Sequence, residues 1–186
     1  MQYHYTQAIL DSELEEILAL QRRNTKRSPE SSEIMQDGFV PVEHSLDLLK
    51  KMNAIAPHVI AKQNNVVVGY ALCMRPSFGN DIPILESRFR ELERLGVADY
   101  MIMGQICVVK AHHKQGFFRS LYATMKSQLT ENYKQLITEV DATNTRSLHT
   151  HLAIGFKTLS TFTANDRDWV VLLLSVYDND SINTIR

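Results

Sequence analysis

The chain has 186 residues, 44% of them hydrophobic, and a formal net charge of −1 at pH 7. That length and hydrophobic content suit one domain with a buried core, so we expect residues 1–186 to form a single domain. The near-neutral charge argues against the strongly basic surface that binds nucleic acid, so no nucleic-acid partner is expected.

The sequence carries no signal for membrane insertion or secretion. No apolar run is long enough to cross a bilayer, and residues 1–10 lack the basic flank and long apolar core of a signal peptide. Cys73 and Cys107 lie in apolar, strand-like runs and are interpreted as buried free thiols, which are typical of a reducing compartment. The sequence thus predicts a cytoplasmic protein with no membrane partner.

The first half of the chain contains several helix signals. Ser12 and Glu15 have the spacing of a capping box, so a helix is expected to begin near Ser12. A second helix is expected to follow Ser45 as its cap, and a third to end at Gly96. The polar stretch Gln21–Val42 is predicted to be a long loop or a broken helix pair.

Runs of apolar and β-branched residues predict the strands. Two pairs of runs are expected to form antiparallel hairpins, one turning at Asn64 and Asn65 and the other at Asn165 and Asp166. The polar end of the chain, Asp178–Arg186, is expected to fray. The expected strands are Tyr3–Ala8, His58–Lys62, Val66–Arg75, Tyr100–Val109, Leu136–Ala142, Lys157–Thr163 and Trp169–Val176.

The most informative segment is a strand, a turn and a helix that run from Tyr100 onward. The turn ends in Gly116, and the helix that follows would place unbonded backbone N–H groups there, at the positive end of its dipole. Such a turn is a ready anion site, although a tight connection without a ligand is an equally open interpretation of these residues. The helix is predicted because apolar residues recur at the spacing of one stripe, at Phe118, Leu121, Tyr122, Met125 and Leu129.

The next strand, Leu136–Ala142, completes a βαβ unit with Tyr100–Val109. A helix crosses between the two strands, so they are expected to pair in parallel. The second half of the chain is therefore predicted to bring the turn at Gly116 to the end of a parallel strand pair.

Two motifs in this region resemble those of the GNAT superfamily of N-acetyltransferases. Residues 108–118 (VVKAHHKQGFF) are similar to the family's acyl-CoA loop, V-x-P-x-(aromatic/His)-(R/Q)-x-x-G-x-(G/A), from which Lys110, His113 and Phe118 depart. Residues 144–156 (NTRSLHTHLAIGF) are similar to the family's N-x-x-(S/A)-x-x-x-(Y/H)-x-x-x-G-F. The second motif lies at the family's usual distance after the loop.

The resemblance implies an α/β (α+β) fold with a mixed, mostly antiparallel twisted sheet of about six to seven strands and about four to five flanking helices. A parallel pair of strands would splay apart at the acyl-CoA site. Acetyl-CoA is the implied cosubstrate, held by the loop and the second motif. The residues that the resemblance assigns to cofactor binding are Cys107, Val108, Val109, His113, Lys114, Gln115, Gly116, Phe117, Phe118, Arg119, Asn144 and His151.

Two residues are candidates for acid–base catalysis. His151 stands where the family usually has Tyr, the residue proposed to protonate the CoA thiolate, and an imidazole suits that task near neutral pH. A histidine packed against the sheet is the alternative, and both stay open. Glu139 is the candidate base, but a solvated or paired carboxylate is favoured for it, and Gln105 could hold a relaying water. For Asn144, the alternative to a cofactor contact is a helix N-cap.

The expected function is transfer of an acetyl group from acetyl-CoA to a primary amine of a small molecule or peptide by direct attack. A non-catalytic CoA-binding or regulatory domain of the same fold is the alternative. A metal centre is not expected, because neither His112 with His113 nor His149 with His151 has a spacing that suits metal ligands on one face. A second copy of the chain remains a candidate partner.

Overall fold

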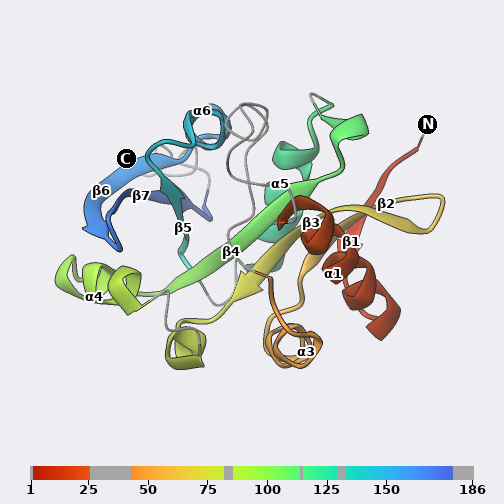
Figure 1. The fold of residues 1–186 in the computed structure, drawn as a ribbon, viewed down its shortest axis with the longest axis horizontal. Helices are drawn as coiled ribbons and strands as arrows, with labels where there is room; N and C mark the ends of the chain where they lie inside the picture. The colour runs from red at the N-terminus through yellow and green to blue at the C-terminus, as the bar shows by residue number, and fades with distance from the viewer. Residues whose placement is uncertain (1, 26–42, 82–85, 114, 130–132, 178–186) are drawn as a thin grey trace, which may run out of the picture.

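The structure is a computed structural model that describes residues 2–25, 43–81, 86–113, 115–129 and 133–177. These residues form seven strands and five α-helices (Figure 1). The strands are β1 (His4–Gln7), β2 (Val59–Gln63), β3 (Val66–Met74), β4 (Tyr100–Val108), β5 (Gln135–Asp141), β6 (Lys157–Ala164) and β7 (Arg167–Ser175). The helices are α1 (Asp11–Thr25), α3 (Leu46–Ile55), α4 (Glu86–Arg94), α5 (Phe117–Leu129) and α6 (Thr145–Ile154), with 3₁₀ turns η1 (Pro76–Asp81) and η3 (Lys110–His112).

The strands form one sheet in the order β1-β2-β3-β4-β5-β7-β6. Every neighbouring pair is antiparallel except β4 and β5, which are parallel because α5 crosses between them. The expected fold class and the expected parallel pair are both confirmed. Expected strand boundaries differ from the observed ones by one to a few residues, which is the usual uncertainty at element ends.

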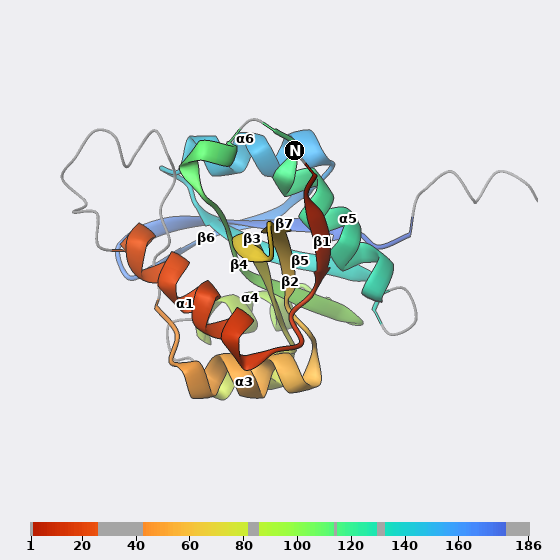
Figure 2. The same ribbon diagram turned by 90° about the vertical axis from the view of Figure 1, so that its right-hand side faces the viewer.

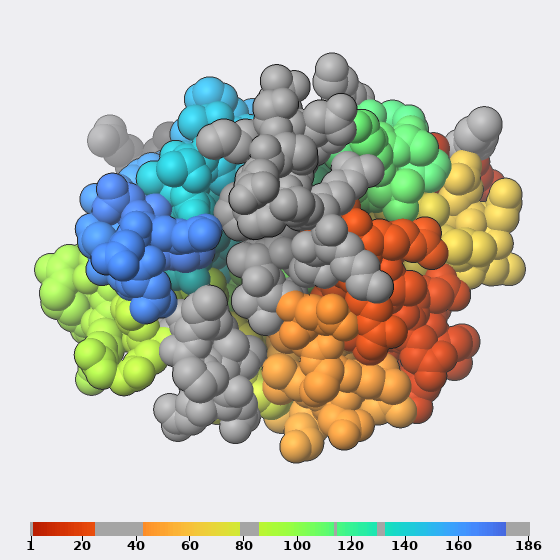
Figure 3. Space-filling view, in the orientation of Figure 1, coloured from red at the N-terminus to blue at the C-terminus, as the bar shows by residue number. Residues whose placement is uncertain are grey.

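Helices cover both faces of the sheet, as Figure 2 shows. On one face, α5 buries its apolar stripe against the strands, and Leu121 and Met125 are fully buried there. On the opposite face, α1 contributes Ile17 to a second cluster, and α4 packs Leu92 against Ile137 of β5. In Figure 3, α1 and α3 lie together on one side of the molecule, whereas α4 and the β6–β7 hairpin lie on the other.

Turn and cap chemistry explains several of the element ends. Asn64 and Asn65 connect β2 to β3 with φ values of 49° and 63°, and the β6–β7 turn is built in the same way. Ser45 caps α3, since its hydroxyl accepts a hydrogen bond from the Leu48 amide at 3.2 Å. Both hairpins and this cap were expected from the sequence and are confirmed.

Helix α1 begins near Ser12 as expected, but its cap and its end differ from the expectation. The helix begins at Asp11, and its first turn is closed by Glu13 rather than by a capping box of Ser12 and Glu15. It also continues to Thr25, so the first residues of the expected loop Gln21–Val42 are helical. The rest of that loop and the expected frayed end lie outside the described residues.

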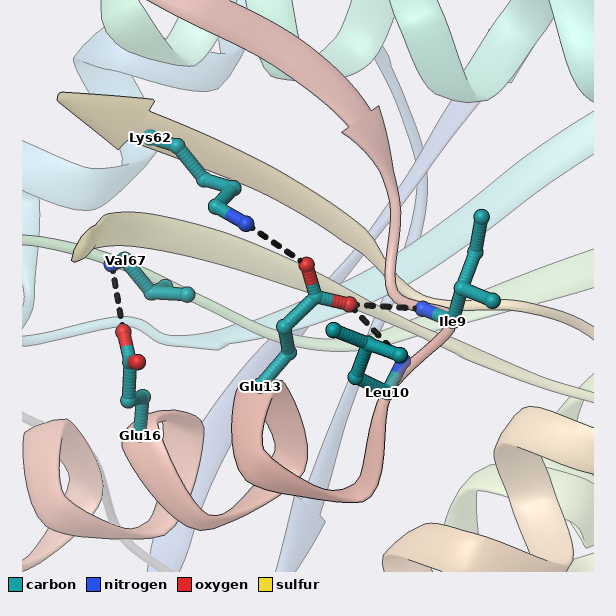
Figure 4. A network of polar contacts seen from close by, with 6 residues as sticks. All are labelled: Ile9, Leu10, Glu13, Glu16, Lys62 and Val67. Atoms are coloured by element: carbon teal, nitrogen blue, oxygen red, sulfur yellow. Dashed lines mark hydrogen bonds and ion pairs between the residues drawn. The ribbon is translucent and has the colours of Figure 1, made fainter. Parts of the chain in front are cut away.

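Glu13 joins three parts of the structure, as Figure 4 shows. Its carboxylate accepts hydrogen bonds from the backbone amides of Ile9 and Leu10 at 2.7 and 2.9 Å and from the Lys62 ammonium at 2.8 Å. Glu16, one turn of α1 later, accepts from the Val67 amide at 2.6 Å. Two acidic side chains therefore fix the helix to β2 and β3.

The bonds to Glu13 also set its charge state. Burial favours the neutral acid, but the hydrogen bonds from Leu10, Lys62 and Ile9 outweigh burial and lower the pKa of Glu13. A carboxylate with a lowered pKa in the folded state stabilises the fold above its ordinary pKa. That contribution is lost as the pH falls through the lowered pKa.

We predict that Glu13→Ala lowers the free energy of unfolding by about 2 to 3 kcal/mol at pH 7, because bonds to a buried charged group are lost. Urea unfolding followed by circular dichroism measures this difference. The matched control is Glu15→Ala, because Glu15 is exposed and should change stability by less than about 0.5 kcal/mol. The gap between parent and Glu13→Ala should narrow below about pH 4.5, and a gap that is constant with pH would contradict the assigned bonds.

Candidate functional site

The site begins where β4 and β5 stop pairing. Their parallel ladder contains Tyr100, Met101 and Ile102, opposite residues 135–137. Beyond Ile102, β4 continues to Val108 paired with β3 alone, while β5 continues paired with β7. A register shift in the β3–β4 ladder lies at the same level, where Leu72 faces Gln105 and Cys73 faces Met103. One edge of β4 thus has no strand partner among the described residues.

The loop after β4 brings a helix N-terminus to this opening. After η3, the chain reaches Gly116, whose φ of +80° is one that residues with a side chain rarely adopt, and α5 begins at Phe117. A Cβ built on Gly116 would meet no heavy atom within 4 Å, so the backbone there has open space in front of it. The amides of the first turn of α5 lack intrahelical acceptors and can bind an anion.

His113 connects the loop after β4 to the start of α6. Its Nε2 lies 2.9 Å from the Val108 carbonyl oxygen and its Nδ1 lies 3.0 Å from Nη2 of Arg146 on α6. A neutral imidazole that donates from Nε2 and accepts at Nδ1 satisfies both contacts. His113 therefore positions the loop and Arg146, and Arg146 is a site residue that the sequence reasoning missed, because no spacing rule links it to His113.

Tyr3, just before β1, holds the other side of the loop. The Tyr3 hydroxyl donates to Oε1 of Gln115 at 2.9 Å and lies 3.2 Å from Nδ1 of His112, while Nε2 of Gln115 donates to the Ala111 carbonyl at 3.2 Å. The Tyr3 ring also packs edge-on against Phe117, which is buried. Gln115 and Phe117 thus contact Tyr3 and fix the conformation of the loop. Lys114 lies outside the described residues.

The second motif forms the start of α6. Asn144 caps this helix, because its side-chain oxygen accepts from the Ser147 amide at 3.2 Å. The cap alternative for Asn144 is therefore present in the structure, and a cofactor contact through its amide nitrogen stays a prediction. Arg119 of α5 is exposed and donates to the Ala153 carbonyl at 3.3 Å, which links α5 to the end of α6.

His151 lies in the interior between α5 and α6. Nε2 lies 2.7 Å from the Tyr122 hydroxyl and Nδ1 lies 2.7 Å from the Ser147 carbonyl oxygen, so both ring nitrogens have partners. The rings of Phe118, Tyr122 and Phe156 surround the imidazole edge-on. Burial lowers the pKa of His151, partly offset by the bond to Ser147. This geometry matches the alternative of a packed histidine.

Two further polar groups line the opposite face of the separated strands. Glu139 of β5 forms an ion pair with Arg88 of α4, which matches the expectation of a paired carboxylate. Across the opening, Gln105 of β4 accepts a hydrogen bond from the Tyr70 hydroxyl at 2.6 Å. Cys107 faces α1, where Nδ2 of Asn24 lies 3.1 Å from its sulfur, and burial raises the pKa of this thiol to about 11.

Comparisons with known proteins agree with this geometry. The family described as FR47-like protein matches residues 93–167, which include both motifs. A GNAT-family protein from Desulfovibrio desulfuricans has a similar structure, with 13% identity and a TM-score of 0.65 over 95% of this chain and 100% of that one. The yncA protein of Salmonella typhimurium, solved with its cofactor acetyl-CoA, has 15% identity and a TM-score of 0.65 over 100% of both chains.

A third solved structure is the ribosomal-protein-alanine N-acetyltransferase of Brucella melitensis, with 18% identity and a TM-score of 0.65 over 92% of this chain and 99% of that one. No match was found among the curated proteins. The chain thus has the mixed α/β fold that these solved structures share. More narrowly, that fold is the GNAT fold, and the resemblance inferred from the two motifs is confirmed.

The described residues contain no group of three or more histidine, cysteine, aspartate and glutamate side chains that could hold a metal ion. None of the helices in this part of the chain is long and apolar enough to span a membrane.

We predict that CoA raises the melting temperature of the parent chain and that Gly116→Val abolishes this shift. The valine side chain would occupy the open space in front of the turn and strain a backbone with positive φ. Differential scanning fluorimetry with and without CoA measures the shift. Gly96→Val is the matched control, because Gly96 has a φ of +65° and equally open surroundings but lies at the end of α4. If both variants keep the shift, the turn is not the cofactor site.

We also predict that His151→Phe lowers the free energy of unfolding by about 1 to 3 kcal/mol, because the buried Tyr122 hydroxyl loses its partner. Adding Tyr122→Phe should recover part of this loss, which a double-mutant cycle of urea unfolding measures. A general acid predicts instead a fall in kcat of about 10²–10⁴-fold for His151→Phe with stability little changed. That second pattern, together with retained activity in His151→Tyr, would overturn the packing role.

Proposed function

We propose that the chain is an N-acetyltransferase that transfers the acetyl group of acetyl-CoA to a primary amine of a small molecule or peptide. The observation that carries this proposal is the separation of β4 from β5 directly beside the glycine turn that opens α5. The FR47-like match over residues 93–167 covers the strands, the turn and the second motif. Acetyl transfer is the activity that this fold supports in general.

The described residues fit the two ends of acetyl-CoA. The edge of β4 beyond Ile102 has no strand partner among the described residues and offers backbone groups to the amide-rich arm of acetyl-CoA up to Val108, whose carbonyl is held by His113. The N–H groups from Gly116 to Arg119 offer an anion site to the pyrophosphate. Asn144 and Arg146 lie at the start of the neighbouring helix. Acetyl-CoA itself supplies an acetyl group that is already activated as a thioester.

The chain's own contribution is then mainly to position the reactants. Holding an amine and a thioester in the correct geometry removes a large part of the barrier without any charged catalytic group. In this proposal His151 and Glu139 support the site, because His151 has partners on both ring nitrogens and Glu139 is paired with Arg88. The amine gives up its proton to solvent or to a water held near Gln105.

The same two observations favour a second candidate function. If His151 and Glu139 serve only the structure, the chain could bind CoA without turning it over, as a regulatory domain of the same fold.

Cys73 and Cys107 are both free and buried, which suits a reducing compartment. We therefore propose the cytoplasm as the location of the protein, whichever of the two functions it has.

We predict that the parent chain releases free thiol from acetyl-CoA when primary amines are supplied, and that mass spectrometry detects the acetylated amine. A panel of uncharged amines, amino acids and short peptides separates the acceptor classes, and the chain without amine is the control for hydrolysis. A melting-temperature shift with CoA but no thiol release with any amine would support the binding domain instead.

A further inference from the structure

Arg88 is a buried cation with unused hydrogen-bond donors. The residue is 3% exposed, and its Nη2 donates to a carboxylate oxygen of Glu139. Nε and Nη1 of the same guanidinium are shielded from solvent and have no partner in the described part of the chain. Buried polar groups in folded proteins are almost always bonded, so these donors call for an acceptor.

Stability alone does not account for this arrangement. Removing two charges from water costs about as much as their attraction returns, and an apolar pair of similar volume often stabilises a fold as well. The unbonded N–H groups add a further cost. A planar guanidinium is, however, well suited to bind a carboxylate through paired N–H groups, which a lysine cannot do in the same way.

The position of Arg88 places these donors beside the opening in the sheet. Leu92 of α4 packs on Ile137, the last residue of β5 that pairs with β4, and Arg88 lies one helical turn earlier, against Glu139. Glu139 is therefore the first residue on this face of β5 after the strands separate. The guanidinium also lies close enough to Tyr100 to lower the pKa of that phenol, against the larger effect of burial, which raises it.

This face is the one that an acceptor amine can use. The glycine turn and α5 lie on the other face, where they are assigned to the cofactor. Gln105 of β4 and Glu139 of β5 look out from the two sides of the opening toward α1 and α4. The Arg88–Glu139 pair lies on this side of the opening.

We propose that Arg88 binds a carboxylate of the acceptor, so that the acceptor is an amine of the amino-acid class; this inference rests on the acetyl transfer proposed above. The free N–H groups of Arg88 would take the carboxylate, and Glu139 would keep the guanidinium in place. Arg88 is then a specificity-determining residue. Charged hydrogen bonds of this kind correspond to a preference of about 10- to 100-fold.

The test compares amines that carry a carboxylate with the corresponding amides, in the parent chain and in variants of Arg88. Acetylation of glycine and β-alanine is measured against glycinamide and β-alaninamide, and the expected ratio of kcat/KM is at least about tenfold in favour of the acids. In Arg88→Lys, which keeps a positive charge beside Glu139 but loses the planar donors, the ratio should fall toward one. Arg90→Lys is the matched control, because Arg90 pairs with Glu86 on the exposed side of the same helix, and it should keep the parent ratio.

Two additions keep the outcomes distinct. If Arg88→Lys does not fold, the double variant Arg88→Met with Glu139→Met removes both charges, and it should treat acids and amides alike. Binding of N-acetylglycine and N-acetylglycinamide, followed by melting temperature, gives a readout that needs no turnover. Arg88-dependent binding of the acid without acetylation of any amine would overturn the proposed function and leave the carboxylate site standing. Acetylation without any preference between acid and amide would overturn the carboxylate site alone.

Discussion

The site depends on the length of one parallel strand pair. β4 and β5 share a ladder at Tyr100, Met101 and Ile102 and then separate, because β4 stays in register with β3 while β5 follows β7. Because sheets twist, β3 and β7 diverge along the sheet. β4 keeps its pairing with β3, β5 keeps its pairing with β7, and the β4–β5 pairing ends. The opening therefore results from strong antiparallel pairing on either side, and the turn at Gly116, Gln105 and Glu139 are placed around it as a consequence.

The polar groups near this opening differ in how fully they are bonded. His151 uses both ring nitrogens inside the core, and His113 uses both of its own to hold the loop. These two imidazoles act as connectors, since breaking either contact leaves a polar atom without a partner. Arg88 is the contrasting case, because most of its donors remain unused although the group is buried. Unused donors are better candidates for ligand contacts than saturated ones.

The N-terminal residues contribute more to the site than their position in the sequence indicates. β1 pairs with β2 at the edge of the sheet, and Tyr3, just before it, bonds Gln115 in the loop. At the other end of the same segment, Glu13 closes the first turn of α1 and reaches Lys62. The segment from Tyr3 to Glu13 thus links the loop before α5 on one face of the sheet to α1 on the other.

Local sequence determined the elements that rest on short-range physics. The turns of the two hairpins (Asn64–Asn65 and Asn165–Asp166), the Ser45 cap of α3 and the apolar stripe after Gly116 each require only neighbouring residues, and each was predicted correctly. The two motifs carried the resemblance to GNAT proteins. That resemblance in turn implied the arrangement of helices and strands around the parallel pair. The sequence pointed to Ser12 and Glu15 as the cap of α1, whereas in the structure the buried Glu13 accepts the hydrogen bond from the Leu10 amide.

Tertiary structure alone decided which side chains share the site. Arg88 meets Glu139 across 51 residues of chain, Arg146 meets His113 across 33, and Tyr122 meets His151 across 29. No local spacing encodes these contacts, because they follow from how α4 and α6 pack on the sheet after the strands have paired. For the same reason the sequence could name His151 and Glu139 as candidates, but only packing determined that one is enclosed by aromatic rings and the other is held by a buried guanidinium.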